Sequence, residues 1–290
     1  MTRALALGLL GAAAAAAPAR AYTAAGDRIF PASILLPQVA PSDETYLTTS
    51  TQPTADGRAT SLSGVFDKSL TERWGIAIED GDNWLDRPHA SSRTGWQNLE
   101  LTVRYLAVVD QTHEFLLSAG VDREFGGTGA RGIGADPHGA TTPTLYFAKG
   151  LGDLDIGYLR PLAVTGTLGY QVADAAPRGD TVVTGIALEY SIPYLESKVA
   201  SLALPAVLRT VTPMVEFLHT SATTSLRNNP SVGQVAPGFN YAGEGWEFGI
   251  EALLPVTRAG GTGPGVTAQL HLSLDFLFAS SIGRPLFGEH

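Results

Sequence analysis

The chain has 290 residues, a formal net charge of −9 at pH 7 and only 16% charged residues. A nucleic-acid partner is not expected, because phosphate binding needs a concentration of Lys and Arg. Cysteine is absent, which excludes disulfides, thiolate metal sites and cysteine nucleophiles. These properties favour an exported protein that interacts with neither nucleic acid nor soft metals.

Residues 1–21 predict a secretory signal peptide. Arg3 supplies the initial positive charge, residues 4–17 are apolar, and residues 18–21 end in the small-x-small pattern of a cleavage site. The apolar run is shorter than the ~18 residues expected of a spanning helix. A membrane anchor is therefore the less favoured alternative.

Residues 22–43 form a separate N-terminal segment. Pro31, Pro37 and Pro41 interrupt its apolar residues, and proline removes the donors that a sheet requires. The segment is consequently a poor barrel strand. Two placements stay open: a plug in the barrel mouth, or a periplasmic tail packed against the rim.

Alternation of apolar and polar residues is the strongest pattern in the remaining chain, and residues 268–278 show it best. Leu270, Leu272 and Leu274 share one face, while Gln269 and His271 share the other. A strand points alternate side chains to opposite faces, so this pattern predicts an apolar wall backed by a polar wall.

Twelve strands are expected, and ten or fourteen remain possible. They are placed near residues 44–51, 58–67, 71–79, 97–109, 113–123, 142–149, 160–173, 181–192, 206–219, 233–242, 245–256 and 266–278. Several reach the roughly ten residues of a tilted membrane strand. We predict an all-β fold, an antiparallel transmembrane β-barrel over residues 44–290 in the bacterial outer membrane. An ordinary soluble β-sandwich is the alternative.

The connections support this topology. Short turns at 68–70 and 110–112 alternate with long loops at 80–96 and 124–141, as periplasmic turns alternate with external loops. The stretch 193–205 breaks the alternation. Aromatic residues near the strand ends predict interfacial girdles: Trp74, Trp96, Tyr170, Tyr190, Tyr241 and Trp246.

Two motifs have simpler explanations than the chemistry they suggest. Residues 127–132 match the GxGxxG string, but no helix is expected after them, so a flexible loop is favoured over a dinucleotide site. Oxygen ligands that can hold Ca²⁺ cluster in the first long loop, at Glu79, Asp80, Asp82, Asn83 and Asp86. Their spacing matches no EF-hand, and we expect no cofactor or metal.

The polar faces of the predicted strands supply candidate pore-lining residues. These are Glu100, Arg104, Glu114, Glu189, Glu216, Glu247, Glu251, Gln269, His271 and Asp275. Acidic residues lining a pore favour cations. The alternative is that these carboxylates pair across a narrow barrel and help to close it.

His271 and Ser273 resemble the His-x-Ser pair of outer-membrane phospholipases and lipid A deacylases, in which a His activates a hydroxyl. Such enzymes hold the pair on the lipid side of the barrel. Here Leu272 lies between them on the apolar face, so alternation directs both toward the lumen. We expect no enzyme, with a lipid hydrolase as the alternative.

Residues 237–243, 246–252, 265–271 and 283–288 resemble bacterial outer-membrane transporter-like barrels grouped under a phenol-degradation (MetA-pathway) label. Residues 28–31 and 36–38 are similar to the N-terminal segments of that group. The resemblance implies a barrel that transports small molecules and identifies no solute. The ending Gly288-Glu289-His290 departs from the aromatic ending of many such barrels.

The expected function is a channel for passive uptake or efflux of small solutes, either hydrophobic, aromatic or cationic. A structural or adhesive barrel acting through loops 80–96 and 220–232 is a further alternative. The expected partners are outer-membrane lipids, lipopolysaccharide, the barrel-assembly machinery and the solute.

Overall fold

The computed structural model describes residues 23–223 and 231–287. The predicted signal peptide and the last three residues lie outside the described residues, as does most of the predicted loop 220–232. No helix in the described ranges is long and apolar enough to cross a bilayer.

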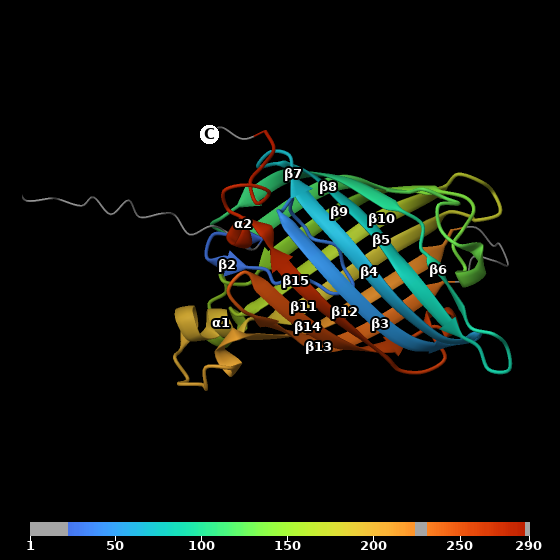
Figure 1. Cartoon of the computed structure of the whole chain (residues 1–290). Helices are drawn as coiled ribbons and strands as arrows, with labels where there is room; N and C mark the ends of the chain where they lie inside the picture. Colours follow the sequence, from blue (N-terminus) through green and yellow to red (C-terminus); the bar gives the residue numbers. More distant parts are fainter. Residues whose placement is uncertain (1–22, 224–230, 288–290) are drawn as a thin grey trace, which may run out of the picture.

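The strands form one closed antiparallel barrel (Figure 1). Twelve strands complete the circle, which closes where β15 pairs with β3. They are β3 (Glu44–Thr54), β4 (Gly57–Ser69), β5 (Trp74–Asp86), β7 (Glu100–Asp110), β8 (Phe115–Glu124), β9 (Ala140–Gly150), β10 (Leu162–Ala173), β11 (Thr181–Tyr190), β12 (Val211–Ala222), β13 (Val232–Ala242), β14 (Trp246–Pro255) and β15 (Gly265–Ser273). The predicted fold class is therefore confirmed.

Alternation along the strands sorts side chains between two environments. On β15, Val266 and Leu270 are about two-fifths exposed on the outer surface, whereas Thr267 and His271 are each 1% exposed on the inner side. Burial of the polar set inside and exposure of the apolar set outside is the reverse of a soluble sandwich. The outer surface therefore fits a lipid bilayer.

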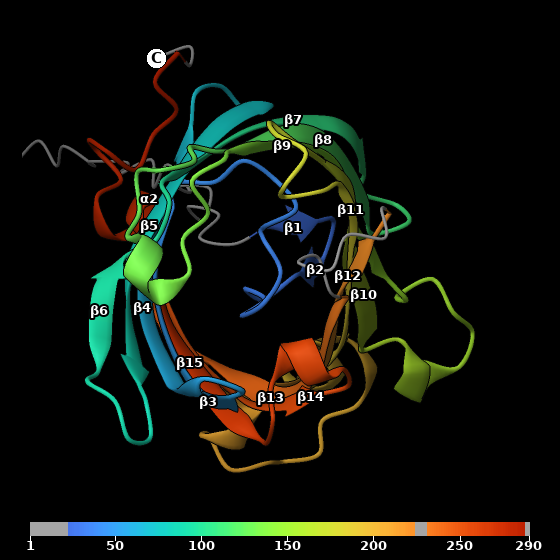
Figure 2. The ribbon, with the colours of Figure 1, turned by 90° about the vertical axis from the view of Figure 1, so that its right-hand side faces the viewer.

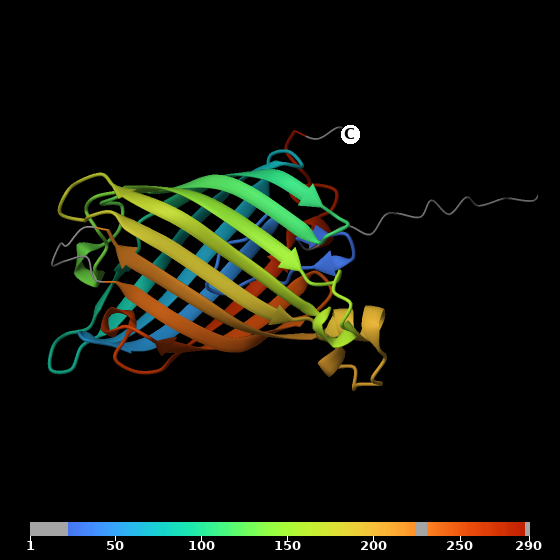
Figure 3. The same ribbon diagram turned by 180° about the vertical axis from the view of Figure 1, so that it is seen from behind.

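The two ends of the barrel differ, as the view from behind also shows (Figure 3). We call "terminal end" the one at which the N-terminal segment enters and β15 finishes. The opposite "loop end" carries β6 (Arg93–Trp96) and the 125–139 connection. Aromatic residues mark both ends: Trp74 and Trp246 begin β5 and β14 at the terminal end, and Trp84 and Tyr170 lie toward the loop end.

The prediction of a long loop over 80–96 is wrong. β5 continues to Asp86, and β6 folds back to pair with it. Side chains fix this hairpin: Asp82 accepts a hydrogen bond from the backbone of Gly95 at 3.1 Å, and Gln97 donates to Asn83 at 3.0 Å. The polar residues that suggested a loop therefore bridge two strands that extend past the barrel wall.

The last strand is shorter than predicted. β15 ends at Ser273, and residues Leu274–Leu277 form the short helix α2. The backbone N–H of Leu274 donates to the carbonyl of Asp43 at 2.8 Å, which turns the chain over the terminal rim. Leu274, Phe276 and Phe278 consequently do not continue the wall.

The connections at the terminal end are not uniformly short. The β11–β12 connection, which includes the stretch 193–205 that breaks the predicted alternation, holds helix α1 (Ile192–Tyr194), a π-helical turn (Leu195–Val199) and a 3₁₀ turn (Leu208–Thr210). The β9–β10 connection also carries a 3₁₀ turn, Gly157–Leu159. The remaining 3₁₀ turns, Arg131–Ile133 and Arg258–Gly260, lie at the loop end.

Residues 23–43 lie inside the barrel, and we call them the inner segment. They begin with a small hairpin of β1 (Ala24–Ala25) and β2 (Arg28–Ile29) and continue without regular structure. Looking along the barrel from the loop end, the blue ribbon of this segment crosses the interior (Figure 2). Phe30 packs there with Leu116 and Tyr146 of the wall.

A charge on the outer surface tests the membrane placement. Ile186 is 50% exposed near the middle of β11, so Ile186→Arg should place a cation near the bilayer centre and destabilise the protein by about 2–4 kcal/mol. Chemical unfolding in lipid vesicles, followed by tryptophan fluorescence, measures this loss. Ile186→Leu is the control, and equal stability of both variants would contradict the placement.

Candidate functional site

Arg28 fixes the inner segment at the terminal end of the lumen. Its side chain is fully buried; Nε lies 3.1 Å from Glu114 Oε2, and Nη1 donates to the carbonyl of Pro161 at 3.1 Å. The guanidinium lies over the ring of Tyr194, whose hydroxyl donates to Glu114 Oε1 at 3.0 Å. Residues of three connections, β7–β8, β9–β10 and β11–β12, thus contact the Arg28 side chain. These contacts supply the partners that a buried charge needs.

Two lumen carboxylates hold the backbone of the inner segment. Glu216 accepts hydrogen bonds from the backbone N–H groups of Ile34 and Leu35, at 2.7 and 2.9 Å. Glu247 accepts one from Ala32 at 2.9 Å. Backbone donors inside a protein need acceptors, and an irregular segment has no ladder to provide them. Charged acceptors give the stronger hydrogen bonds.

Glycines in the wall make room for this segment. A Cβ added to Gly185 would lie 2.2 Å from the side chain of Leu36, and one added to Gly249 would lie 2.6 Å from Ile34. Both glycines occupy strands, where glycine otherwise weakens packing. Their positions are explained by the close approach of the inner segment to the wall.

The predicted pore-lining residues divide into several groups. Glu100, Arg104 and Gln269 line a cavity. Glu114, Glu216 and Glu247 contact the inner segment, as does Arg104 through the carbonyl of Ala40. Glu189, Glu251 and His271 are buried on the inner face of the barrel wall, and each is 1% exposed.

The placement of Asp275 on the inner face of the last strand is wrong. Asp275 belongs to α2, past the end of β15, and accepts a hydrogen bond from the hydroxyl of Ser273. The turn of the chain over the rim removes it from the strand pattern on which the prediction depended.

His271 lies between two carboxylates. Its Nε2 is 3.3 Å from Glu44 and its Nδ1 is 3.7 Å from Glu247, while its ring stacks on Tyr46 with 4.7 Å between centroids. Ser273 is 0% exposed. A lipid hydrolase would need this His-x-Ser pair on the lipid side, and the structure places both residues inside the barrel.

A cavity of about 510 Å³ occupies the lumen beside the inner segment. Leu35, Leu36 and Pro37 contribute to its lining, together with polar residues of the strands. A second hollow of about 880 Å³ lies toward the loop end. The two adjoin, because Glu100 and Gln171 line both. The inner segment therefore lies at the end of a polar recess that begins at the loop end.

Three carboxylates form one wall of the cavity, and we call Glu79, Glu100 and Asp122 the acidic wall. Glu79 and Glu100 are directly opposite each other on β5 and β7. Asp122 accepts hydrogen bonds from the hydroxyls of Thr102 and Thr144, at 2.7 and 2.6 Å. No hydrogen bond or ion pair links the side chain of Glu79 or Glu100 to another described residue.

Sequence reasoning missed part of this wall. The predicted strand ends at Glu79, which places this residue in the acidic loop, whereas β5 continues to Asp86. Asp122 lies on the predicted polar face of its strand, so alternation alone directs its side chain into the lumen. Within the described residues, no group of three or more His, Cys, Asp or Glu side chains is arranged to hold a metal ion.

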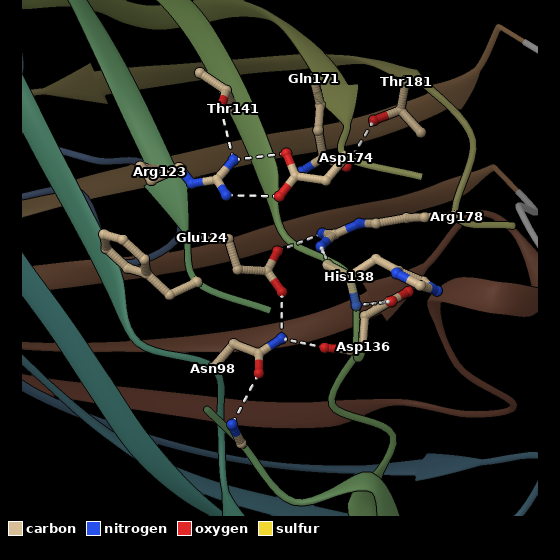
Figure 4. A network of polar contacts seen from close by, with 12 residues as sticks. Asn98, Arg123, Glu124, Asp136, His138, Thr141, Gln171, Asp174, Arg178 and Thr181 are labelled. Carbon is tan, nitrogen blue, oxygen red and sulfur yellow. Dashed lines mark hydrogen bonds and ion pairs between the residues drawn. The ribbon is translucent and has the colours of Figure 1, made fainter. Parts of the chain in front are cut away.

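A polar network shapes the mouth at the loop end (Figure 4). Asn98 donates to Glu124 at 2.6 Å and to the carbonyl of Asp136 at 2.8 Å, and Glu124 also pairs with Arg178. Arg178 donates to the carbonyl of His138 at 2.8 Å. These contacts tie the Gly-rich 125–139 connection to the strand ends. The GxGxxG string is thus part of a loop folded over the mouth.

Arg123 and Asp174 form a bidentate ion pair at this mouth, with N···O distances of 2.7 and 2.6 Å. Hydrogen bonds from Arg123 lower the pKa of Asp174 below its ordinary value of 3.8. A carboxylate with a lowered pKa contributes stability above the ordinary value and loses it as the pH falls through the folded value. The pair is therefore intact at neutral pH.

No family model and no curated protein matches the chain. Among solved structures, the chain is similar to an outer membrane channel from Pseudomonas putida F1, with a TM-score of 0.55, 11% identity, and coverage of 84% of this chain and 99% of that one. It is also similar to the NanC porin, with a TM-score of 0.50, 9% identity, and coverage of 79% and 98%. These similarities show the fold of an outer-membrane β-barrel, in agreement with the predicted localisation.

Loss of the buried Arg28 contact should loosen the inner segment. Arg28→Ala leaves Glu114 without its charged partner, and breaking one side of a buried pair costs about 3–5 kcal/mol. Chymotrypsin digestion with mass spectrometry should show faster cleavage within residues 23–43.

Lys198→Ala is the matched control, because Lys198 also bridges to the inner segment, 2.7 Å from Asp27, but in an exposed pair. Exposed pairs contribute about 0–1 kcal/mol, so this variant should be cleaved like the unaltered protein. Equal cleavage of Arg28→Ala and Lys198→Ala would contradict the anchoring role of Arg28.

Proposed function

We propose that the protein is an outer-membrane channel for small solutes, which enter the lumen from the loop end. The observation that carries this proposal is the pair of adjoining hollows, about 510 and 880 Å³, inside a closed barrel with an apolar outer surface. Residues of many strands line these hollows, and the inner segment completes the lining of the smaller one.

The acidic wall supports a preference for cationic solutes. Carboxylates along a pore favour cations, and Glu79 and Glu100 face the cavity without a partner among the described side chains. Leu36, Val183 and Leu218 line the same cavity, so a solute with a hydrocarbon part and a positive charge suits both surfaces.

The inner segment would then limit passage at the terminal end. It is held there by Arg28 and by the carboxylates of Glu216 and Glu247. A solute that reaches the cavity passes beside this segment or displaces part of it. Conductance should accordingly be small for a barrel of this circumference.

We also propose that the chain is a member of the phenol-degradation barrel group. The fold and the position of residues 28–31 inside the barrel are compatible with it, and the label identifies no solute. Contacts with lipopolysaccharide and insertion by the barrel-assembly machinery are proposed on the same basis. The long connections at the loop end would face the exterior, as in other outer-membrane barrels.

Planar-bilayer recording tests the channel and its selectivity. The unaltered protein should conduct, with a reversal potential in a salt gradient that indicates cation preference. The double change Glu79→Gln with Glu100→Gln should move the reversal potential toward zero, because it removes the two carboxylates proposed to attract cations. Asp56→Asn, in the β3–β4 turn at the loop end, should leave it unchanged.

Each negative result has a separate meaning. Absence of conductance at every voltage would remove the channel proposal. Conductance with a reversal potential unaffected by the double change would leave a channel and remove the acidic wall as its selectivity element.

A further inference from the structure

Two connections at the terminal end carry apolar side chains outside the barrel. One joins β9 to β10 and the other joins β11 to β12; Figure 2 shows them, yellow-green and gold, beyond the circle of strands. We call their exposed apolar side chains the terminal shelf. The most exposed are Ile156 (62%), Tyr158 (59%), Val207 (56%), Leu202 (46%) and Leu208 (44%), and Leu154 and Leu159 follow at 40% and 39%.

The two connections have a defined shape. Gly157 of the first packs against the second, since a Cβ there would lie 3.3 Å from Val199. Glu196 accepts a hydrogen bond from the backbone of Leu202 at 2.9 Å, and Arg209 donates to the carbonyl of Leu204 at 2.8 Å. Internal polar contacts thus satisfy the backbone while apolar side chains are left outward. Such exposed apolar groups mark a surface that contacts another phase or molecule.

The shelf is continuous with the lipid-facing wall. Ile186 and Leu188 face outward on β11 with 50% and 42% exposure, and Tyr190 follows them at the strand end. The hydroxyl of Tyr190 donates to the carbonyl of Tyr158 at 3.2 Å, which joins the wall directly to the shelf. Tyrosine is enriched at the level of the lipid headgroups. The shelf therefore begins at the depth where the hydrocarbon ends.

We propose that the terminal shelf lies in the interface of the adjacent lipid leaflet, with its apolar side chains at the boundary between headgroups and acyl chains. Both connections flare outward past the wall, so they extend over the membrane (Figure 2). Arg209, exposed next to Leu208, supplies a cation for lipid phosphates. The shelf fixes the depth of the barrel, and this role is independent of whether the barrel conducts.

Spin labels test the proposal, because the chain has no cysteine and each introduced cysteine is unique. Ile156→Cys and Val207→Cys place labels on the shelf. Leu188→Cys is the lipid control and Asp56→Cys, in the β3–β4 turn, is the aqueous control. The labelled proteins are reconstituted in vesicles of phosphatidylethanolamine and phosphatidylglycerol. Collision with oxygen and with a water-soluble nickel complex is then measured for each label.

Both shelf labels should prefer oxygen, as the Leu188 label does, at a depth of about 5–10 Å below the headgroup surface. Nickel collision matching the Asp56 label would overturn the proposal and indicate an aqueous surface. Spin–spin broadening at the shelf would overturn it in favour of contact with a second copy. Tyr158→Cys and Leu202→Cys provide further sites, and heat-dependent gel mobility verifies that each variant is folded.

Discussion

A charged carboxylate buried inside the barrel costs several kcal/mol unless partners replace the solvent. The inner segment supplies many of those partners. Arg28 pairs with Glu114, and backbone N–H groups reach Glu216 and Glu247. The exchange is mutual, since an irregular segment has backbone donors that need acceptors. The wall and the segment are therefore each incomplete without the other.

This pairing divides the lumen into two parts of different character. In the part occupied by the inner segment, Glu114, Glu216 and Glu247 form hydrogen bonds with that segment. Toward the loop end, Glu79 and Glu100 line open space, and the mouth is shaped by pairs such as Arg123 with Asp174. The same residue type is structural in one half and available to a solute in the other. The position of a carboxylate along the barrel axis therefore decides whether it binds the inner segment or lines the cavity.

The strand number and the inward or outward direction of most side chains follow from alternation alone. His271 and Leu270 have the burial that a period of two requires. Alternation fails where a strand ends for reasons outside the strand: β15 stops because the backbone of Leu274 bonds to Asp43, far away in sequence. It fails also at β5, where cross-strand contacts of Asp82 and Asn83 extend a segment rich in turn-forming residues.

The role of each lumen carboxylate is harder to predict than its direction. A strand pattern states that Glu216 points inward, but its function depends on whether the inner segment reaches it. Glycines carry part of that information: Gly185 and Gly249 interrupt apolar strands at the points of close approach to Leu36 and Ile34. These two glycines therefore mark places where the inner segment touches the wall, whereas others, such as Gly166 and Gly238, face residues of neighbouring strands. Glu79 and Glu100 have no such contact with the inner segment and line the cavity instead.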